Sequence, residues 1–519
     1  MFIKINAGTV DGIDAVGVTV EVNMGGSGIG LYLVGLPDNA IKESQERINA
    51  AFGNLKLIMT SKKIVVNLAP ADLRKEGAAY DLPIAIGILA VTGQVESEPL
   101  SESMILGELS LDGSIRPIKG ALPMAIWAKE RGFKRIILPK ENSAEAAIVE
   151  GIDVLGIDSL RELVDWLNGM GEIEPTKVPT FQFDLDKEGE DELYNEDFAD
   201  VKGQAQVKRA FEIAAAGGHN IIMIGPPGSG KTMLARRLPT ILPPMSMREA
   251  LETTKIYSVA GKLGVKEGLM MERPFRAPHN ITSQVAIIGG GSSPQPGEVS
   301  LANNGILFLD EMPEFGRNLL EILRQPLEEK QITIARARYN VCYPANFTLV
   351  ASMNPCPCGY YNHPTKECTC SSGAVHRYLG RVSGPLLDRI DLQIEVAPVS
   401  ISQINDERAE ESSATIRRRV IAARERQRER FEAVGVESSS ATNAMMTGRM
   451  LRELCPLDAK ARKMLEMAME RLQLSARAYD RIIKVARTIA DLDCSEQITV
   501  SHITEAIGYR SLDRDSWGR

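Results

Sequence analysis

The stretch that most constrains this 519-residue chain is a glycine-rich loop between an apolar run and a helix-forming segment. Residues 220–238 read NIIMIGPPGSGKTMLARRL and contain the pattern G-x-x-x-x-G-K-T. The flanking strand and helix are the context that a phosphate-binding loop requires, which makes an ordinary glycine-rich turn the weaker alternative. We therefore predict a P-loop, formed by Gly225, Pro226, Pro227, Gly228, Ser229, Gly230, Lys231 and Thr232.

Two side chains at the end of this loop have distinct expected roles. Glycines in the loop let backbone N–H groups and the start of the helix face an anion. Lys231 is then expected to reach the β- and γ-phosphates, and Thr232 to ligate Mg²⁺. The loop thus predicts ATP and Mg²⁺ as cofactors.

Two later strands are predicted to end beside the P-loop. In NGILFLDEMPEF the apolar residues Ile306 to Leu309 predict a buried strand, with Asp310 and Glu311 at its carboxyl end. We expect Asp310 to hold the metal ion through water and Glu311 to polarise the attacking water. The next strand, NFTLVASMN, ends at Asn354, which could orient the same water or could merely end the strand.

Arginines in two further segments are candidates for sensing the γ-phosphate. GPLLDRIDL places Arg389 on a short turn that we expect to be exposed and without a partner in its own subunit. It is predicted to stabilise transition-state charge in a neighbour's site, the alternative being a pair with Asp388 or Asp391. Arg477 and Arg481 lie four residues apart on one predicted helical face. Arg477 is predicted to touch the γ-phosphate and Arg481 to be structural.

The order of these motifs carries a family resemblance. The chain resembles the magnesium-chelatase-like branch of the AAA+ ATPases, because its motifs occur in the same order: P-loop, ILFLDE, NPCPCG, LLDRID and SARAYDRI. The part from DFADVKGQ onward resembles the ComM/YifB group, with PFRAPHN, PGEVSLAN and LRQPLEE also in order. It departs where the group usually has histidines, at Asn280 and Asn303, so no role that needs those side chains is transferred.

The resemblance implies a ring-forming, usually hexameric, Mg²⁺-dependent ATPase. For the ComM group it implies a DNA helicase that drives branch migration during natural transformation, so single-stranded or branched DNA is the expected partner. Three rivals are a motor subunit that inserts Mg²⁺ into a porphyrin, an ATP-dependent protease, and a nucleotide-gated scaffold without turnover. The intact Glu311 speaks against the scaffold.

The fold class that follows is α/β, with an AAA+ P-loop domain that carries a helical C-terminal lid and is preceded by a Lon-protease-like α/β domain. The expected boundaries are 1–170 for the Lon-like domain, 171–197 for an acidic linker, 198–400 for the AAA+ core and 401–519 for the helical lid. Residues 184–200 alone carry nine acids and one lysine, which equals the net charge of −8 of the whole chain. Any contact with nucleic acid must therefore come from local basic features.

The N-terminal domain is predicted to be an inactive protease. Residues 105–142 resemble the proteolytic domain of Lon proteases, whose chemistry needs a serine nucleophile and a lysine that accepts its proton. Matching the segments by their glycines puts Ala79 at the serine position and Met124 at the lysine position. Neither side chain can act in that chemistry, so we expect a scaffold that helps to hold DNA.

Two segments are expected, by the resemblance, to face the pore of the ring. One is residues 272–302, with a loop at Gly289 to Gly291. The other is a hairpin over residues 330–347, where Arg336 and Arg338 share one face of an alternating strand. These arginines suit phosphate contacts that do not read sequence, and the alternative is solvated charge that protects a hairpin edge.

Four cysteines follow Asn354 within a short loop. Cys356 and Cys358 are separated from Cys368 and Cys370 by nine residues, which could place four thiolates around one structural Zn²⁺. The spacing is not the usual C-x₂-C, so a redox-sensitive dithiol and unligated thiols stay open, and His363 is an alternate ligand. Cys342, Cys455 and Cys494 stand alone and are expected to be packing residues.

The sequence predicts a cytoplasmic protein without a membrane partner. The N-terminus reaches Lys4 without an apolar signal region. The longest apolar run, Leu82 to Val91, is far shorter than the roughly 18 residues that suggest a membrane span.

Overall fold

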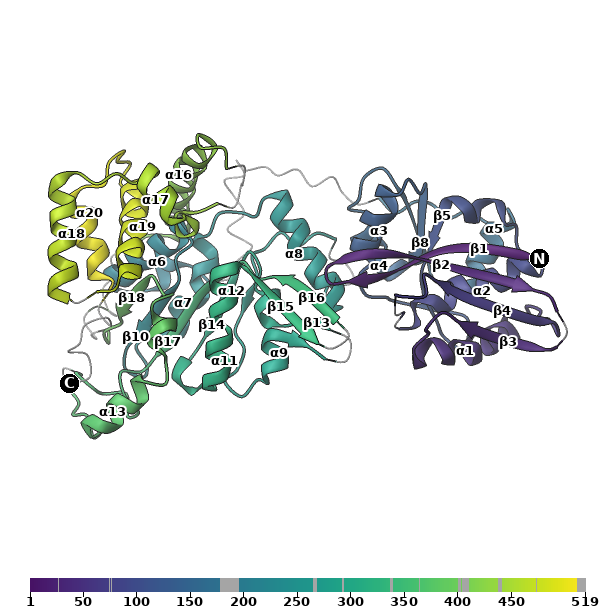
Figure 1. The fold of residues 1–519 in the computed structure, drawn as a ribbon, viewed down its shortest axis with the longest axis horizontal. Helices are drawn as coiled ribbons and strands as arrows, with labels where there is room; N and C mark the ends of the chain where they lie inside the picture. Colours follow the sequence, from purple (N-terminus) through teal and green to yellow (C-terminus); the bar gives the residue numbers. More distant parts are fainter. Residues whose placement is uncertain are drawn as a thin grey trace.

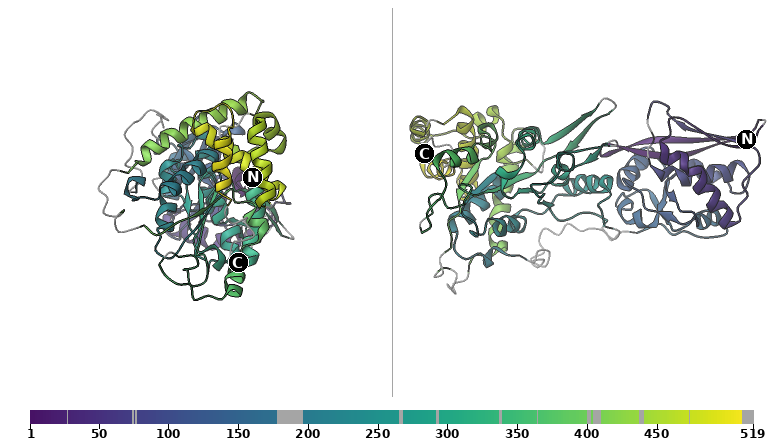
Figure 2. Two further views of the ribbon diagram at one scale, coloured as in Figure 1. Left: turned by 90° about the vertical axis from the view of Figure 1, so that its left-hand side faces the viewer. Right: turned by 90° about the horizontal axis from the view of Figure 1, so that it is seen from below.

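The computed structural model describes residues 1–26, 28–73, 75, 77–177, 196–264, 268–291, 294–336, 339–363, 365–399, 403, 410–436, 441–472 and 474–510, without the side chains of 336 and 339. The molecule is elongated, and its parts follow one another along the long axis (Figure 1). The N-terminal sheet and its helices form one end, the nucleotide-binding part lies in the middle, and the C-terminal helices form the other end. The view from below shows the same order (Figure 2).

The N-terminal part is built on a mixed sheet of seven strands within the described residues, in the order β3-β4-β2-β1-β5-β8-β9. The strands are β1 Phe2–Asp11, β2 Asp14–Met24, β3 Gly30–Val34, β4 Lys63–Ala69, β5 Ser103–Ile105, β8 Arg135–Pro139 and β9 Asp153–Ile157. The helices packed with them are α1 Asn39–Leu55, α2 Asp81–Val91, α3 Ala121–Glu130, α4 Lys140–Ala146 and α5 Leu160–Leu167.

Alternation of apolar and polar residues explains the central strands of this sheet. In β4, Ile64, Val66 and Leu68 are buried while the residues between them are partly exposed, as expected for a strand with one covered face. Every residue of α2 is buried, so the longest apolar run of the sequence forms a core helix. Among the described residues, no helix is both long and apolar enough to cross a membrane.

The middle part contains a parallel sheet in the order β11-β14-β17-β10-β18. Its strands are β11 Phe275–Arg276, β14 Ile306–Leu309, β17 Thr348–Met353, β10 Ile221–Ile224 and β18 Leu392–Glu395. Because the strands are parallel, the loops that follow β10, β14 and β17 meet at one edge of the sheet. Helices around it include α6 Ala205–Gly217, α7 Lys231–Ile241, α8 Met247–Ala260, α10 Glu298–Leu301, α11 Arg317–Ile322, α12 Arg324–Glu329, α13 Ser372–Leu379 and α14 Gly384–Leu387.

The hairpin expected before β17 is present. It consists of β15 Gln331–Arg336 and β16 Tyr339–Pro344, paired antiparallel. The other segment expected to face the pore, residues 272–302, is called the insertion below. It contains α9 Gln284–Ile288 and the short strand pair β12 Gly289–Gly290 and β13 Gln295–Pro296. The side chain of Arg336 and all of Arg338 lie outside the described residues.

The insertion and the β15–β16 hairpin pack against each other. The Tyr343 hydroxyl donates to the Pro294 carbonyl at 2.8 Å. Ile334 of the hairpin lies close to Gly289, since a Cβ on this glycine would be 2.8 Å from Ile334 Cδ1. The φ angle of +103° at this position favours glycine. The insertion and the β15–β16 hairpin therefore form one structural unit.

The region after residue 400 is helical where it is described, as predicted. Its helices are α16 Ser413–Glu432, α17 Gly448–Leu454, α18 Ala459–Leu472, α19 Ala476–Leu492 and α20 Val500–Gly508. Apolar residues of these helices share one buried core with α6, α7 and β10, among them Val420, Ile489 and Leu234. Arg510 is also buried, and its guanidinium donates to the Ile390 carbonyl beside β18 at 2.6 Å.

The N-terminal part contacts the middle part through α8. The Gly120 N–H donates to the Ser258 carbonyl at 3.0 Å, and Lys255 pairs with Asp14 at 2.8 Å. At the tip of the β1–β2 turn, Ile13 packs against apolar residues of the middle part. Most of the predicted acidic linker, residues 178–195, lies outside the described residues.

Candidate functional site

The P-loop links the end of β10 to the start of α7. Gly228 and Gly230 have left-handed φ angles of +78° and +87°, which glycine adopts without strain. At Gly225 a Cβ would lie 2.3 Å from the Val396 carbonyl oxygen, so a side chain there would collide with backbone. The glycines of the motif are thus required by the path of the loop, and the N-terminal N–H groups of α7 open onto it.

Lys231 extends across this loop. Its ammonium donates to the carbonyls of Gly225 at 2.7 Å and Pro226 at 3.0 Å, and to Asn354 Oδ1 at 3.3 Å. Burial lowers the pKa of Lys231, and the nearby carboxylates of Asp310 and Glu311 act in the opposite direction. A lysine whose ammonium is held by neutral carbonyls of the P-loop is well placed to move onto a phosphate.

Asp310 lies directly beside the start of α7. Thr232 Oγ1 donates to Asp310 Oδ2 at 2.9 Å, and the Ser352 hydroxyl donates to Asp310 Oδ1. A hydroxyl and a carboxylate in contact are the oxygen ligands that Mg²⁺ prefers, so these residues fit the metal of a nucleotide complex. Ser352 had not been singled out from sequence, although its place in β17 next to the polar strand end is a usable signal.

Glu311 follows Asp310 in a strained conformation. Its φ angle is +52°, in the left-handed region that non-glycine residues rarely adopt. The Glu311 N–H donates to Ser352 Oγ at 3.1 Å, which helps to hold this turn. The side chain is exposed, so its carboxylate is accessible to a water molecule.

Asn354 lies at the end of β17, between the P-loop strand and the strand that carries Asp310. Its side chain contacts Lys231, as described above. Its backbone N–H donates to the phenol oxygen of Tyr378 in α13, whose pKa is raised to about 12, mainly by burial. Asn354 therefore lies at the meeting point of three active-site segments.

Arg389 is not where the sequence predicted it. Its side chain is only 7% exposed, and Nη2 lies 2.5 Å from Glu328 of α12. Nη1 donates to the Pro385 carbonyl at 2.5 Å. The expectation of an exposed arginine without a partner in its own subunit is wrong, because α12 brings a carboxylate that is distant in sequence onto the turn.

Arg477 and Arg481 lie in the first turns of α19. Arg477 is exposed and makes no ion pair among the residues that the structure describes. Arg481 pairs with Asp391, whose side chain is 3% exposed and accepts the Asn220 N–H at 3.1 Å. Burial raises the pKa of Asp391, but Arg481, His219 and Lys484 lower it further, so that it lies below its ordinary value. Arg481 is thus part of a buried network, in agreement with a structural role.

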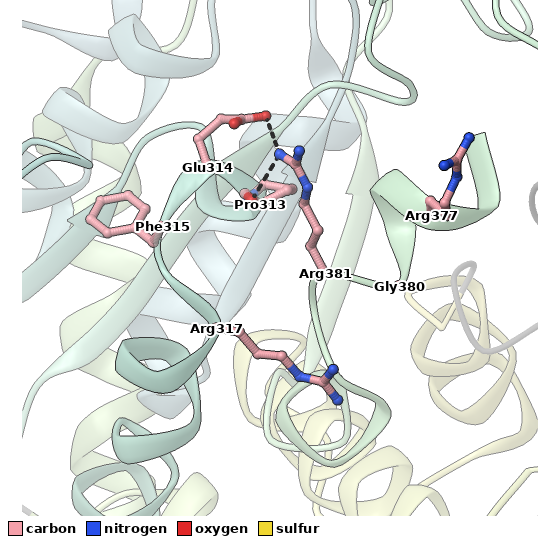
Figure 3. A pocket seen from close by; sticks show the side chains of 7 residues that line it. All are labelled: Pro313, Glu314, Phe315, Arg317, Arg377, Gly380 and Arg381. Carbon is pink, nitrogen blue, oxygen red and sulfur yellow. Dashed lines mark hydrogen bonds and ion pairs between the residues drawn. The ribbon is translucent and has the colours of Figure 1, made fainter. Parts of the chain in front are cut away.

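A basic hollow of about 500 Å³ lies beside the Glu311 turn. Arg317, Arg377 and Arg381 line it, and all are exposed (Figure 3). Arg381 pairs with Glu314 at 2.7 Å, whereas the guanidinium groups of Arg317 and Arg377 point elsewhere (Figure 3). The sequence motifs had not identified this group of arginines.

The predicted cysteine loop brings its four thiols together. Cys356 Sγ lies 3.3 Å from Cys358 Sγ and 3.6 Å from Cys368 Sγ, and all four sulfur atoms lie within 4.8 Å of one another. His363 is outside this group, and its Nδ1 accepts the N–H groups of Thr365 and Lys366. Of the other cysteines, Cys455 is buried, as expected of a packing residue, but Cys342 and Cys494 are exposed.

In the N-terminal part, the positions matched to the protease are occupied by small and apolar groups. Met124 is only 3% exposed and belongs to the hydrophobic core. Ala79 lies in the short turn before α2, and its carbonyl accepts the Gly107 N–H at 2.9 Å. Both residues therefore have structural contacts.

Comparisons with known proteins match nearly the whole chain. The family described as magnesium chelatase, subunit ChlI, matches residues 197–404, and its C-terminal family matches residues 410–510. A third family, described as subunit ChlI of Mg-chelatase, matches residues 18–142.

Individual relatives agree with this result. The chain is 44% identical to YifB of Escherichia coli (strain K12) over 505 residues, 97% of this chain and 96% of that protein. It is 43% identical to the competence protein ComM of Haemophilus influenzae over 506 residues, with the same coverage of 97% and 96%. Lon protease 2 of Bacillus subtilis is 26% identical over 149 residues, 28% of this chain and 26% of that protein.

Both long matches extend through the P-loop, the Asp310–Glu311 turn and the C-terminal helices. Membership implies ATP and Mg²⁺ as ligands, which the geometry of Lys231, Thr232 and Asp310 fits. The chain belongs to the ComM/YifB family of magnesium-chelatase-like AAA+ ATPases.

Proposed function

We propose that this ATPase is a hexameric ring motor that moves along DNA and drives branch migration of joined strands. The observation that carries the proposal is the convergence of Lys231, Thr232, Asp310, Glu311 and Asn354 at one edge of the parallel sheet. Such a site splits ATP, and a motor needs that reaction coupled to a second surface.

The roles within one subunit follow from the contacts. Lys231 would leave its loop carbonyls to bind the β- and γ-phosphates, and Thr232 and Asp310 would hold Mg²⁺. Glu311 would polarise the attacking water, and Asn354 would orient it. Arg477 is exposed at the start of α19 and would contact the γ-phosphate of its own subunit.

Arg389 would act on the nucleotide of a neighbouring subunit. For this it must leave Glu328, because that carboxylate now neutralises its charge. Arg389 would then exchange its ion pair with Glu328 for a contact with the phosphate of the neighbouring subunit. The position of the arginine would therefore depend on whether the ring is assembled. If Arg389 stays paired, the exposed Arg317, Arg377 and Arg381 beside Glu311 are the alternative source of a guanidinium at the subunit boundary.

The second surface would be the unit formed by the insertion and the β15–β16 hairpin. The insertion leads through α10 into β14, and the hairpin leads into β17, so each of its two segments connects to a strand that carries site residues. Arg336 and Arg338 at the hairpin would contact DNA phosphates. DNA as the partner is also supported by the name of the Haemophilus relative, a competence protein.

A motor subunit of a metal-inserting chelatase is the second candidate. It is favoured by the descriptions of the matching families, which name ChlI of magnesium chelatase. A protease is disfavoured, because Ala79 and Met124 cannot supply a nucleophile and a base.

Strand displacement on forked DNA tests the proposal. Purified wild type should hydrolyse ATP faster when forked DNA is added and should separate the strands, whereas Glu311→Gln should bind ATP without either activity. If the wild-type chain turns over ATP at a rate that neither single-stranded nor forked DNA changes, and separates no strands, the DNA motor is wrong. The chelatase candidate would then be tested by ATP-dependent Mg²⁺ insertion into a porphyrin with partner subunits added.

A further inference from the structure

We propose that Cys356, Cys358, Cys368 and Cys370 bind one structural Zn²⁺, and that this metal braces the P-loop. The described sulfur–sulfur distances are 3.3 Å for Cys356 to Cys358 and 3.6 Å for each of these to Cys368. A tetrahedron of thiolates at the usual Zn–S distance of about 2.3 Å has sulfur atoms about 3.8 Å apart. The four thiols thus already lie close to the arrangement that zinc requires.

Backbone N–H groups surround the sulfur atoms of the cluster. The N–H groups of Tyr360 and Thr369 donate to the Cys358 sulfur. The Cys370 N–H donates to the Cys368 sulfur, and the Cys358 N–H to that of Cys370. Donors directed at sulfur from several peptide groups offset the negative charge of a four-thiolate site, as outer contacts of a metal centre do.

The geometry disfavours the alternatives that the sequence left open. A disulfide needs two sulfur atoms about 2.05 Å apart in a specific torsion, whereas here three sulfur atoms are mutually within 3.6 Å, so no pair stands out. Unligated thiols have no physical reason to gather four sulfur atoms in one place from two segments separated by nine residues. Carboxylates and His363 are not part of the cluster, so soft thiolate ligands select zinc over Mg²⁺.

The cluster is joined to the nucleotide site at three points. Cys356 is two residues after Asn354. Gly359 packs onto the P-loop, since a Cβ there would lie 2.5 Å from Pro227 Cδ. After Cys370 the chain enters α13, whose Tyr378 accepts the Asn354 N–H.

A metal that ties the two halves of the loop together would therefore fix the turn that covers Pro227 and the helix that supports Asn354. Without it the described part of the loop would lose a strong link between its two halves, because these cysteines form no disulfide. We expect loss of zinc to weaken nucleotide binding while leaving the sheet intact. The bracing role rests on the ATPase site and does not depend on DNA as the partner.

Metal analysis of the full-length chain tests the binding itself. Protein from zinc-supplemented cells, purified without chelator, should contain close to one zinc per chain, and the double variant Cys368→Ser/Cys370→Ser should contain almost none. Cys342→Ser/Cys494→Ser, at the exposed cysteines outside the cluster, should retain the metal. Wild type with far less than one zinc per chain, or with iron in its place, would overturn the proposal without reference to any variant.

Binding of a fluorescent ADP analogue tests the bracing role. Cys368→Ser/Cys370→Ser should raise the Kd about tenfold or more, the size of effect seen when outer contacts of a site are lost. Gly359→Val should also raise the Kd while the zinc content stays at one, because it disturbs the contact with Pro227 and keeps all four thiols. Unchanged Kd in both variants would contradict the bracing role. Neither readout uses DNA, so failure here is distinguishable from failure of the proposed motor.

Discussion

The N-terminal part and the ATPase part of this molecule treat their candidate catalytic positions in opposite ways. Around the P-loop, each predicted position carries a side chain that can act, and Lys231, Asp310 and Asn354 meet within hydrogen-bonding networks. In the N-terminal part, the matched positions carry Ala79 and Met124, and Met124 is packed in the core. The ATPase part keeps polar side chains at its site that can bind a ligand, whereas the N-terminal part has small or apolar side chains at the matched positions.

The largest effect is expected at the ATPase site. Glu311→Gln should lower the rate of ATP hydrolysis by about 10²- to 10⁴-fold, because a general base contributes roughly that factor. Nucleotide affinity should stay within about threefold, since the phosphates are held by the P-loop. Glu272→Gln, at an exposed glutamate of the same part, is the matched control and should leave turnover unchanged. Equal loss in both variants would show that Glu311 has no special role.

Buried aspartates extend the comparison to stability. In the ATPase part, Asp391→Asn leaves Arg481 without its carboxylate and should cost about 3–5 kcal/mol, as breaking a buried ion pair does. In the N-terminal part, Asp81→Asn removes a carboxylate that pairs with Arg47, and should cost only about 1–2 kcal/mol, because burial of Asp81 outweighs the attraction of this one arginine whereas Asp391 has several cations around it. Hydrogen exchange measured separately in the two parts would check both values. A larger loss for Asp81→Asn would reverse the ranking.

The same aspartates predict opposite responses to pH. Several cations hold the pKa of Asp391 below its ordinary value of 3.8, so its contribution to stability is present above that pH and is lost as the pH falls further. Burial raises the pKa of Asp81 despite Arg47. Its contribution is present below pH 3.8 and is lost as the pH rises through the folded-state pKa. Replacing each aspartate by asparagine should remove the dependence of the unfolding free energy on pH that this aspartate causes, and should leave the dependence caused by the other aspartate unchanged.

A change in the core of the N-terminal part should show what Met124 does there. Met124→Lys restores the residue type that the protease chemistry uses, but it places an unpaired charge in a hydrophobic core. We expect a loss of about 2–4 kcal/mol in stability, against less than about 1.5 kcal/mol for Met124→Leu. Casein cleavage should be absent in the wild type and in both variants. Cleavage by the wild type would contradict an inactive domain.

The smallest effect is expected at Ser352, whose hydroxyl contacts Asp310 and the Glu311 backbone. Ser352→Ala should reduce turnover about tenfold, because supporting contacts of a metal ligand typically have effects of that order. The Mg²⁺ concentration at half-maximal activity should rise in parallel. Loss of turnover with an unchanged Mg²⁺ requirement would place the effect of Ser352 on Glu311 alone.

Local sequence patterns predicted the elements that carry the site. The apolar runs before Gly225 and Asp310 form parallel strands, because strands are encoded by neighbouring residues. The hairpin before β17, which the family resemblance implied, is also present. The α/β class and the helical C-terminal part follow from the same patterns.

Contacts between distant segments could not be predicted in this way. Glu328 reaches Arg389 across 61 positions of sequence, and no local pattern links α12 to that turn. The contact of Gly359 with Pro227 likewise joins segments that are far apart in sequence. The group of Arg317, Arg377 and Arg381 arises only because the end of α13 lies beside the Glu311 turn. The DNA contacts predicted for Arg336 and Arg338 stay predictions, because the side chain of Arg336 and all of Arg338 lie outside the described residues.

A mixing experiment tests the central claim, a nucleotide site completed by a neighbouring subunit, most directly. Lys231→Ala abolishes the P-loop of one subunit but keeps its Arg389, and Arg389→Ala does the reverse. Each variant alone should be almost inactive. An equal mixture that is allowed to exchange subunits should recover about a quarter of the wild-type ATPase rate, because about a quarter of the subunit boundaries then combine an intact P-loop with an intact Arg389. A mixture that stays inactive although mixed rings form, or Arg389→Ala protein with full activity by itself, would contradict the account.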